Sequence, residues 1–115
     1  MSRRDPGSAI RDMISHAEEA IDLVAGKTRG DLDRDRVLQL AIVRLVEIVG
    51  EAARRVPEME RANVRNVPWR AIVGMRDHLI HGYHAVDLDI LWIVVQDDLP
   101  ALVGELRKTL PREPR

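Results

Sequence analysis

Several residue types that build rigid cores or carry reactive groups are scarce in this chain of 115 residues. It contains no cysteine and no phenylalanine, one tyrosine and two tryptophans. The absence of cysteine excludes disulfides, thiolate metal sites and cysteine nucleophiles. With so few aromatic residues, the core must consist of Leu, Ile, Val, Ala and Met, a mixture that favours helices over a sheet sandwich.

Long apolar runs and a strong net charge are also missing. No stretch of about 18 apolar residues occurs, so we expect no membrane span. The N-terminus MSRRDPGSAIRD lacks an apolar run after its arginines, so we expect no signal peptide and a cytoplasmic protein. The net charge of −1 argues against a broad basic surface for nucleic acid. All cations except Lys27 and Lys108 are arginines, which suits phosphate binding; genomic base composition is the alternative explanation of this bias.

Apolar residues recur at helical three–four spacing over most of the chain. The pattern predicts main helices at residues 8–25, 36–56, 69–81 and 88–110, with a kink or split at Pro100. Residues 26–35 are expected to form a polar loop, with Asp33 or Asp35 as the cap of the second helix, and residues 57–68 a connector with one short helical turn. Asp87 is expected to cap the last helix. We therefore predict one all-α domain over residues 1–115, with its core at about 8–110. It is an up-down bundle of four main helices plus a short extra helix.

The second predicted helix, VLQLAIVRLVEIVGEAA, is apolar on nearly every side. Such a helix is buried in the fold, by a partner, or by both, so we expect a homodimer. Arg44, Glu47 and Glu51 interrupt it as one polar stripe. Two interpretations stay open: a solvated face with ion pairs, or a set of supporting groups that face a polar cleft.

Residues 75–87, MRDHLIHGYHAVD, concentrate an arginine, three histidines and a tyrosine. Asp77 and His78 lie four and three residues before His81, spacings that can hold a metal. No further ligand cluster supports such a site, so we expect no metal and no cofactor. Only Ser2, Ser8 and Ser15 are available as serine nucleophiles, none in a strained turn, and no glycine-rich phosphate loop occurs.

Acid–base chemistry on a phosphodiester fits these residue types. A histidine moves protons near neutral pH, and an arginine binds the charge of a pentacoordinate phosphorus. Without a metal, the reaction on RNA is attack by the ribose 2′-OH, a nucleophile that DNA lacks. On an ideal helix Arg76 and His81 lie about 140° apart, so a distorted helix end or a two-fold axis must bring them together. His78 and His84 are better explained by favourable contacts with a helix C-terminus.

The spacing of Arg76, His81 and Tyr83 matches the RX4HXY signature of HEPN-domain toxins. Further blocks resemble the HepT-like branch of that superfamily: RLVEIVGEAARRVP, VPWRAIVGMRDHLIHGY, VDLDILW and QDDLPAL. The resemblance runs from about Ser8 to Leu110. The signature alone is moderately specific, but together with the GEAA, PWR and VDLD blocks it is strong.

The resemblance implies a HEPN-like homodimer with both motifs in one cleft, acting as a metal-independent endoribonuclease toxin of a toxin–antitoxin module. The implied antitoxin is a minimal nucleotidyltransferase, MNT. Arg76 and His81 would be catalytic, and Tyr83 would be the tyrosine that receives AMP. Asp77 departs from the asparagine frequent in relatives; its carboxylate could orient His81 or repel RNA. Asp77, His78, Glu47, Glu51 and Arg44 are the candidate supporting groups.

A second hypothesis is a non-enzymatic helical partner of a nucleotidyltransferase, which uses the motif as a docking or nucleotide-binding surface. The complete Arg–His–Tyr set favours the enzyme. The near-zero net charge and the lack of an aromatic stacking platform favour the binding partner.

Overall fold

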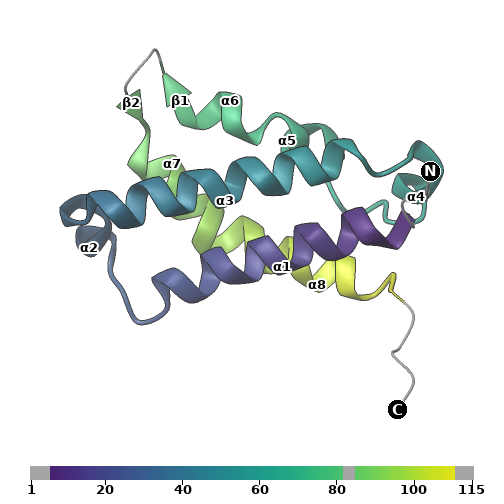
Figure 1. Ribbon diagram of the computed structural model, residues 1–115, viewed down its shortest axis with the longest axis horizontal. Helices are drawn as coiled ribbons and strands as arrows, with labels where there is room; N and C mark the ends of the chain where they lie inside the picture. Colours follow the sequence, from purple (N-terminus) through teal and green to yellow (C-terminus); the bar gives the residue numbers. More distant parts are fainter. Residues whose placement is uncertain (1–5, 82–84, 111–115) are drawn as a thin grey trace.

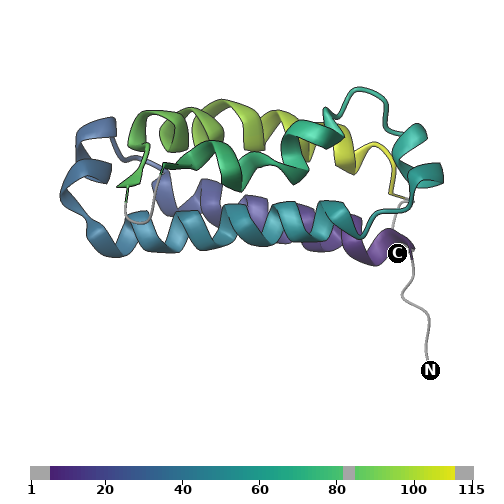
Figure 2. The same ribbon diagram turned by 90° about the horizontal axis from the view of Figure 1, so that it is seen from above.

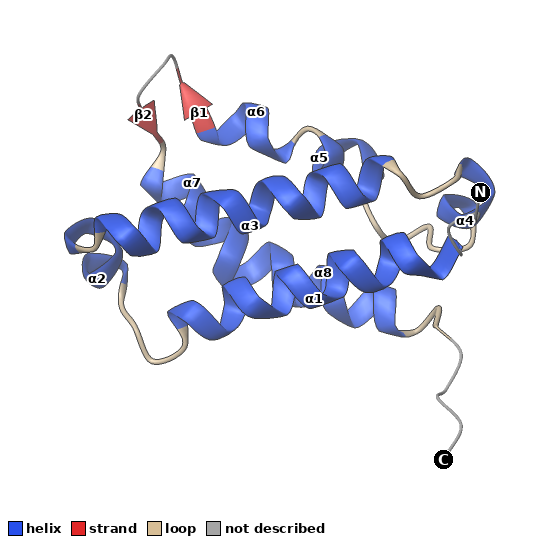
Figure 3. Ribbon diagram, in the orientation of Figure 1, coloured by secondary structure: helices blue, strands red, loops and turns tan. Residues whose placement is uncertain are grey.

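The computed structural model describes residues 6–81 and 85–110, and within them the chain forms a helical bundle (Figures 1 and 3). Four rods alternate in direction. They are α1 (Pro6–Val24), α3 (Arg36–Arg54), α5 (Trp69–Val73) with α6 (Met75–Leu79), and α7 (Leu88–Ile93) continued by the π-helical η1 (Val94–Asp98) and α8 (Leu99–Arg107). The short helices α2 (Arg29–Arg34) and α4 (Glu58–Ala62) lie in connections. The predicted helical bundle is confirmed at this level.

The rods form two layers, with α1 beside α3 in one and α5–α6 beside α7–α8 in the other (Figure 2). The core between them is apolar: among the described residues, no polar or charged side chain is buried. Met13, Ile42, Leu99 and Leu106 are fully enclosed. No helix in the described ranges is long and apolar enough to cross a membrane.

The first two main helices match their predicted ranges to within two residues. After α1, Gly26 has a φ of 75°, which glycine adopts without steric cost. Asp35 caps α3 by accepting a hydrogen bond from the Leu38 backbone N–H at 3.0 Å. The prediction of a polar loop over residues 26–35 is wrong, because Thr28 and Asp31 form a capping box that begins α2.

The third rod corrects the sequence prediction most clearly. A single helix over residues 69–81 is expected, but the helix is interrupted at Gly74, and α6 ends at Leu79. Strand β1 (Ile80–His81) follows and pairs with β2 (Ala85–Val86) in antiparallel register. The helical spacing of apolar residues does not anticipate this hairpin, because each strand has only two residues.

The last rod confirms Asp87 as the cap of α7, since its carboxylate accepts from the N–H groups of Asp89 and Ile90. Its predicted apolar stripe faces the core, with Leu91, Val95, Leu99, Leu102 and Leu106 buried. Pro100 does not split the rod. Instead, the turn before it widens into the π-helical η1, consistent with the amide hydrogen that proline lacks.

Candidate active site at the α6–β1 corner

The arginine and histidine of the motif lie on two different elements. Arg76, Asp77 and His78 belong to α6, and His81 belongs to β1. The structure describes the backbone of Arg76, His78 and His81 but not their side chains, and Tyr83 and His84 lie outside the described residues. Asp77 is exposed. The functions assigned to these residues therefore stay predictions. The structure adds the backbone positions of Arg76, His78 and His81.

The ideal-helix relation between Arg76 and His81 does not apply, because the helix ends two residues before His81. Beyond it, Ile80 pairs with Val86 and His81 with Ala85. The two strands therefore run in opposite directions, with His81 beside Ala85. A helix that ends within the motif is the first of the two arrangements expected for bringing these residues together, and whether their side chains meet stays a prediction.

We call the end of α6 together with β1 the α6–β1 corner. Backbone hydrogen bonds hold both sides of this corner. The Asp87 N–H donates to the Leu79 carbonyl at 2.8 Å, and the Asp77 N–H donates to the Gly74 carbonyl at 3.0 Å. Since the Asp87 carboxylate also caps α7 at 3.0 and 3.1 Å, this one residue ties the start of α7 to the end of α6. Met75 and Leu79 anchor α6 in the core. The VDLD block thus holds the ends of the segment that carries the motif.

The PWR block anchors the other end of the rod. The Trp69 indole N–H donates to the carbonyls of Arg61 and Val64 at 3.2 and 3.1 Å, and the Arg61 guanidinium lies 5.6 Å from the Trp69 ring centroid. Arg61 in turn donates to the carbonyls of Val56 and Ala53, at 3.0 and 3.1 Å. These bonds fix the connector against the C-terminal end of α3.

A close approach of α3 and α5 determines which residues of α3 lie beside the motif. A Cβ at Gly50 would lie 3.3 Å from the Ile72 carbonyl oxygen and 3.5 Å from that of Val73. The two rods run in opposite directions, and α3 also packs against α6. Three residues before Gly50 on α3 is Glu47, and three residues after Val73 is Arg76. The register therefore places the backbones of Glu47 and Arg76 at the same level.

The polar stripe on α3 divides into two parts. The guanidinium of Arg44 and the carboxylate of Glu51 form an ion pair at 3.6 Å, and both side chains are more than 60% exposed. Such a pair contributes little to stability, and its exposure is what the solvated interpretation expects of these two residues. Glu47 is half-buried and is the member of the stripe at the level of Arg76.

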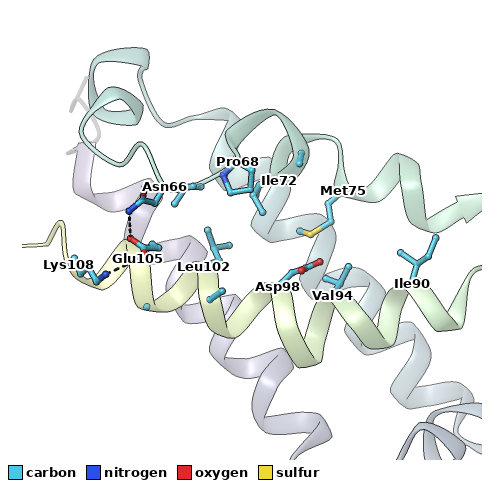
Figure 4. Close-up of a pocket in the computed structure, with 14 residues that line it drawn as sticks. Asn66, Pro68, Ile72, Met75, Ile90, Val94, Asp98, Leu102, Glu105 and Lys108 are labelled. Carbon is cyan, nitrogen blue, oxygen red and sulfur yellow. Dashed lines mark hydrogen bonds and ion pairs between the residues drawn. The ribbon is translucent and has the colours of Figure 1, made fainter.

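Sequence reasoning missed a groove on the molecule. It lies between α5–α6 and the last rod and has a volume of about 770 Å³. Ile72, Met75, Val94 and Leu102 line it, with Asp98 near its middle (Figure 4). No sequence signal could have found it, because its walls belong to rods about 25 residues apart in the chain. Among the side chains that the structure describes, no three His, Asp or Glu residues gather as metal ligands.

A helical bundle with an RX4HXY segment where a helix runs into a short antiparallel strand pair has the features of a HEPN-type domain. The family model described as ribonuclease HepT-like matches residues 13–109. The chain belongs to this family, which confirms the resemblance seen in the sequence and the ribonuclease class that it implies.

Individual relatives agree with the family match. The chain is 37% identical over 102 residues to a protein of Thermococcus cleftensis named "Probable ribonuclease HepT", covering 85% of this chain and 93% of that protein. It is 32% identical over 106 residues to a candidate RNase of Methanocaldococcus jannaschii, covering 92% and 97% of the two chains. A candidate RNase of Caldanaerobacter subterraneus is 34% identical over 110 residues, covering 96% and 98%. No solved structure gives a significant match.

Proposed function

We propose that this protein is the toxin of a HEPN/MNT-type toxin–antitoxin module, a metal-independent endoribonuclease that acts as a homodimer. The observation that carries the proposal is the complete Arg76–His81–Tyr83 set in a member of the HepT-like ribonuclease family. Its backbone setting supports the proposal, because the helix ends between the arginine and the histidine.

The proposed reaction needs only groups of the protein and the RNA. His81 removes the proton from a ribose 2′-OH, whose oxygen attacks the adjacent phosphorus. The P–O5′ bond then breaks, and the products are a 2′,3′-cyclic phosphate and a 5′-OH that has gained a proton from an acid. With two motifs in one cleft, the second copy's histidine is available as that acid. Arg76 stabilises the charge on the pentacoordinate phosphorus.

Glu47 is the positioning residue that the register favours. Its backbone lies at the level of Arg76, and its side chain is half-buried. A carboxylate there can hold a guanidinium in one orientation through charge-assisted hydrogen bonds. Asp77, exposed on α6, is a carboxylate beside Arg76 that can repel an incoming RNA phosphate.

Tyr83 is the proposed site of regulation. The antitoxin would transfer AMP from ATP to the phenolic oxygen of Tyr83, with pyrophosphate as the leaving group. Each AMP adds a phosphodiester charge where an RNA phosphate must bind, and so blocks the cleft. The net charge of −1 keeps the non-enzymatic binding partner as the second candidate, since weak autonomous binding of RNA is expected at that charge.

Expression in bacterial cells tests the toxin role. The wild type expressed alone should stop growth, and Arg76→Ala should not. Co-expression with the cognate nucleotidyltransferase should restore growth and add the mass of AMP to the wild type but not to Tyr83→Phe. If the wild type is harmless alone yet binds the nucleotidyltransferase equally with or without Arg76, the binding-partner function replaces the toxin.

A further inference from the structure

The small net charge of the chain hides an uneven distribution of charge. Residues 54–70, which run from the C-terminal end of α3 through the connector into α5, contain five arginines and two glutamates. The net charge of this segment is +3, so the rest of the chain carries −4 within the total of −1. A segment whose charge opposes that of the remaining chain favours a local site for an anionic partner.

Hydrogen bonds gather this segment at the end of the bundle where α4 lies (Figure 1). The Arg61 guanidinium donates to backbone carbonyls at the C-terminal end of α3. The Trp69 indole N–H donates to the carbonyls of Arg61 and Val64. The end of α3, the connector and the start of α5 therefore meet around one guanidinium and one indole, which makes this end of the molecule a fixed scaffold.

Three arginines with exposed side chains project from this scaffold: Arg54 on α3, Arg65 in the connector and Arg70 on α5. The Arg54 carbonyl accepts from the Arg61 guanidinium at 3.4 Å. Arg65 directly follows one of the carbonyls that bind the indole, and Arg70 directly follows the indole residue itself. We call Arg54, Arg65 and Arg70 the connector arginines.

The connector arginines have no ion-pair partner within residues 6–81 and 85–110, and Glu58 and Glu60 of the same segment pair with none of them. Other arginines of the chain do pair with carboxylates: Arg29, Arg34, Arg44, Arg55 and Arg107. A guanidinium presents a planar fork of N–H donors that matches the oxygens of a phosphate. Three such groups on one scaffold form a surface suited to a chain of phosphates.

The connector arginines and the motif lie along the same rod. From Arg70 to Leu79, α5 and α6 rise by roughly 14 Å, at about 1.5 Å per residue. Phosphates of a stacked strand follow each other at about 3.4 Å, so about four phosphates span this distance. Because the Asp77 carboxylate beside the motif can repel phosphate, attraction of a nucleic-acid strand depends on cations further along the rod.

The opposite end of the bundle offers cations in a different setting. Lys27, Arg34 and Arg36 are exposed there, but residues 27–36 also contain three aspartates. Arg34 pairs with one of them, Asp31, at 2.9 Å. A phosphate at this end would meet carboxylates between the cations, so this surface is the natural control for the connector arginines.

We propose that the connector arginines form a phosphate-binding site for an RNA strand that runs along α5–α6 to the motif. Such contacts hold the backbone of the strand without reading its bases. The site would supply affinity and set the path of the strand, while the motif would supply the chemistry. The assignment deepens the proposed function and rests on it, because the proposed function makes RNA the substrate.

Binding of an RNA that cannot be cleaved tests the site directly. The probe is a fluorescent single strand of about 20 nucleotides with 2′-O-methyl riboses, which lack the attacking hydroxyl. The connector variant combines Arg54→Ala, Arg65→Ala and Arg70→Ala. The control variant removes the same charge from the α2 end and combines Lys27→Ala, Arg34→Ala and Arg36→Ala.

The connector variant should raise the Kd for this probe at least about tenfold, and the control variant less than about threefold. Each phosphate contact to a single strand contributes about 0.7 to the slope of log affinity against log salt concentration, so the slope should fall by about 2 in the connector variant alone. Equal losses in the two variants, or no binding by the wild type, would overturn the proposal. Either result would leave an acidic protein as the partner of this surface.

Replacing the connector arginines by lysines separates charge from packing. The lysine variant keeps three cations that can contact phosphate as point charges, so it should recover most of the affinity and of the salt slope. If it bound the probe as weakly as the alanine variant, while both unfolded at the wild-type midpoint, a phosphate-binding role would be contradicted.

Cleavage kinetics distinguish this site from the proposed function itself. The connector variant should raise KM at least about fivefold and leave kcat nearly unchanged, because its arginines bind the strand away from the reacting phosphate. A loss confined to kcat would contradict the assignment. A wild type that binds the probe through these arginines but cleaves no RNA would refute the proposed ribonuclease and leave the phosphate site standing.

Discussion

The helical core and the α6–β1 corner are built on different principles. In the core, α1, α3 and α8 bury apolar side chains at regular spacing, and Met13, Ile42 and Leu99 are fully enclosed. At the corner, a five-residue helix and two two-residue strands hold the motif, tied by a few backbone bonds to Asp87 and Gly74. Core packing therefore determines stability, and the corner carries the residues proposed for the chemistry.

The largest expected effect lies at the corner and concerns activity alone. Arg76→Ala should lower RNA cleavage by roughly 10²–10³-fold, the loss typical when one charge-stabilising donor is removed. Its unfolding midpoint should stay close to that of the wild type, because Met75 and Leu79 supply the buried contacts of α6. Arg44→Ala, in an exposed ion pair, is the control and should keep both activity and midpoint. A large loss of stability in Arg76→Ala would erase the distinction between the regions.

The next effect lies in the core and concerns stability. Leu99→Ala removes a fully buried side chain and should lower the free energy of unfolding by about 2–5 kcal/mol. Leu40→Ala, at a half-exposed position on α3, should cost less than about 1 kcal/mol. Urea denaturation of the three proteins at one concentration measures both differences. Similar losses at the two positions would mean that Leu40 is covered by a partner.

Asp87 joins the two regions, so its replacement should affect both. Asp87→Ala removes the cap of α7 and should cost about 1 kcal/mol of unfolding free energy. It should also lower cleavage, because the Leu79–Asp87 bond positions the hairpin. Asp87→Asn, which still caps a helix, should keep most of the stability. If Asp87→Ala lost stability while cleaving RNA at the wild-type rate, the corner would not depend on this tie.

The smallest expected effect is on stability, when each of two glycines within helices is replaced by alanine. Gly30→Ala in α2 should gain up to about 1 kcal/mol of stability from helix propensity, because the nearest neighbour of the new Cβ is the flexible end of Arg34 at 3.2 Å and the Thr28 hydroxyl lies at 3.7 Å, an ordinary contact distance. At Gly50 the Cβ meets the backbone carbonyl of Ile72 at 3.3 Å, so the same gain should be cancelled. Thermal unfolding of both variants decides this. An equal gain at Gly50 would show that α3 and α5 can move apart freely.

The difference between the helical core and the α6–β1 corner also explains which features the sequence can predict. The long helices follow from apolar spacing, and Asp35 and Asp87 are recognised as caps because the residue type and the start of the pattern coincide. Helix α2 was missed although Thr28 and Asp31, three residues apart ahead of Leu32, form a readable signal. The hairpin leaves no such signal, since two-residue strands form only through tertiary contacts.

The motif residues are predictable because their spacing is characteristic of a family, not because packing requires them. Their arrangement was less accessible. The end of α6 at Leu79 and the level of Glu47 against Arg76 depend on how rods distant in sequence pack together. The groove beside Met75 depends on the same packing.

The most direct test of the account is cleavage of total RNA by the purified protein in excess EDTA, beside His81→Ala. His16→Ala is the matched control, because His16 lies on α1 and bonds to the Asp12 carbonyl at 2.7 Å. The account predicts cleavage by the wild type and His16→Ala, ends that carry 2′,3′-cyclic phosphate, and a loss of about 10²–10⁴-fold in His81→Ala. No cleavage by a folded wild type whose mass shows Tyr83 unmodified, or equal cleavage by His81→Ala, would contradict it.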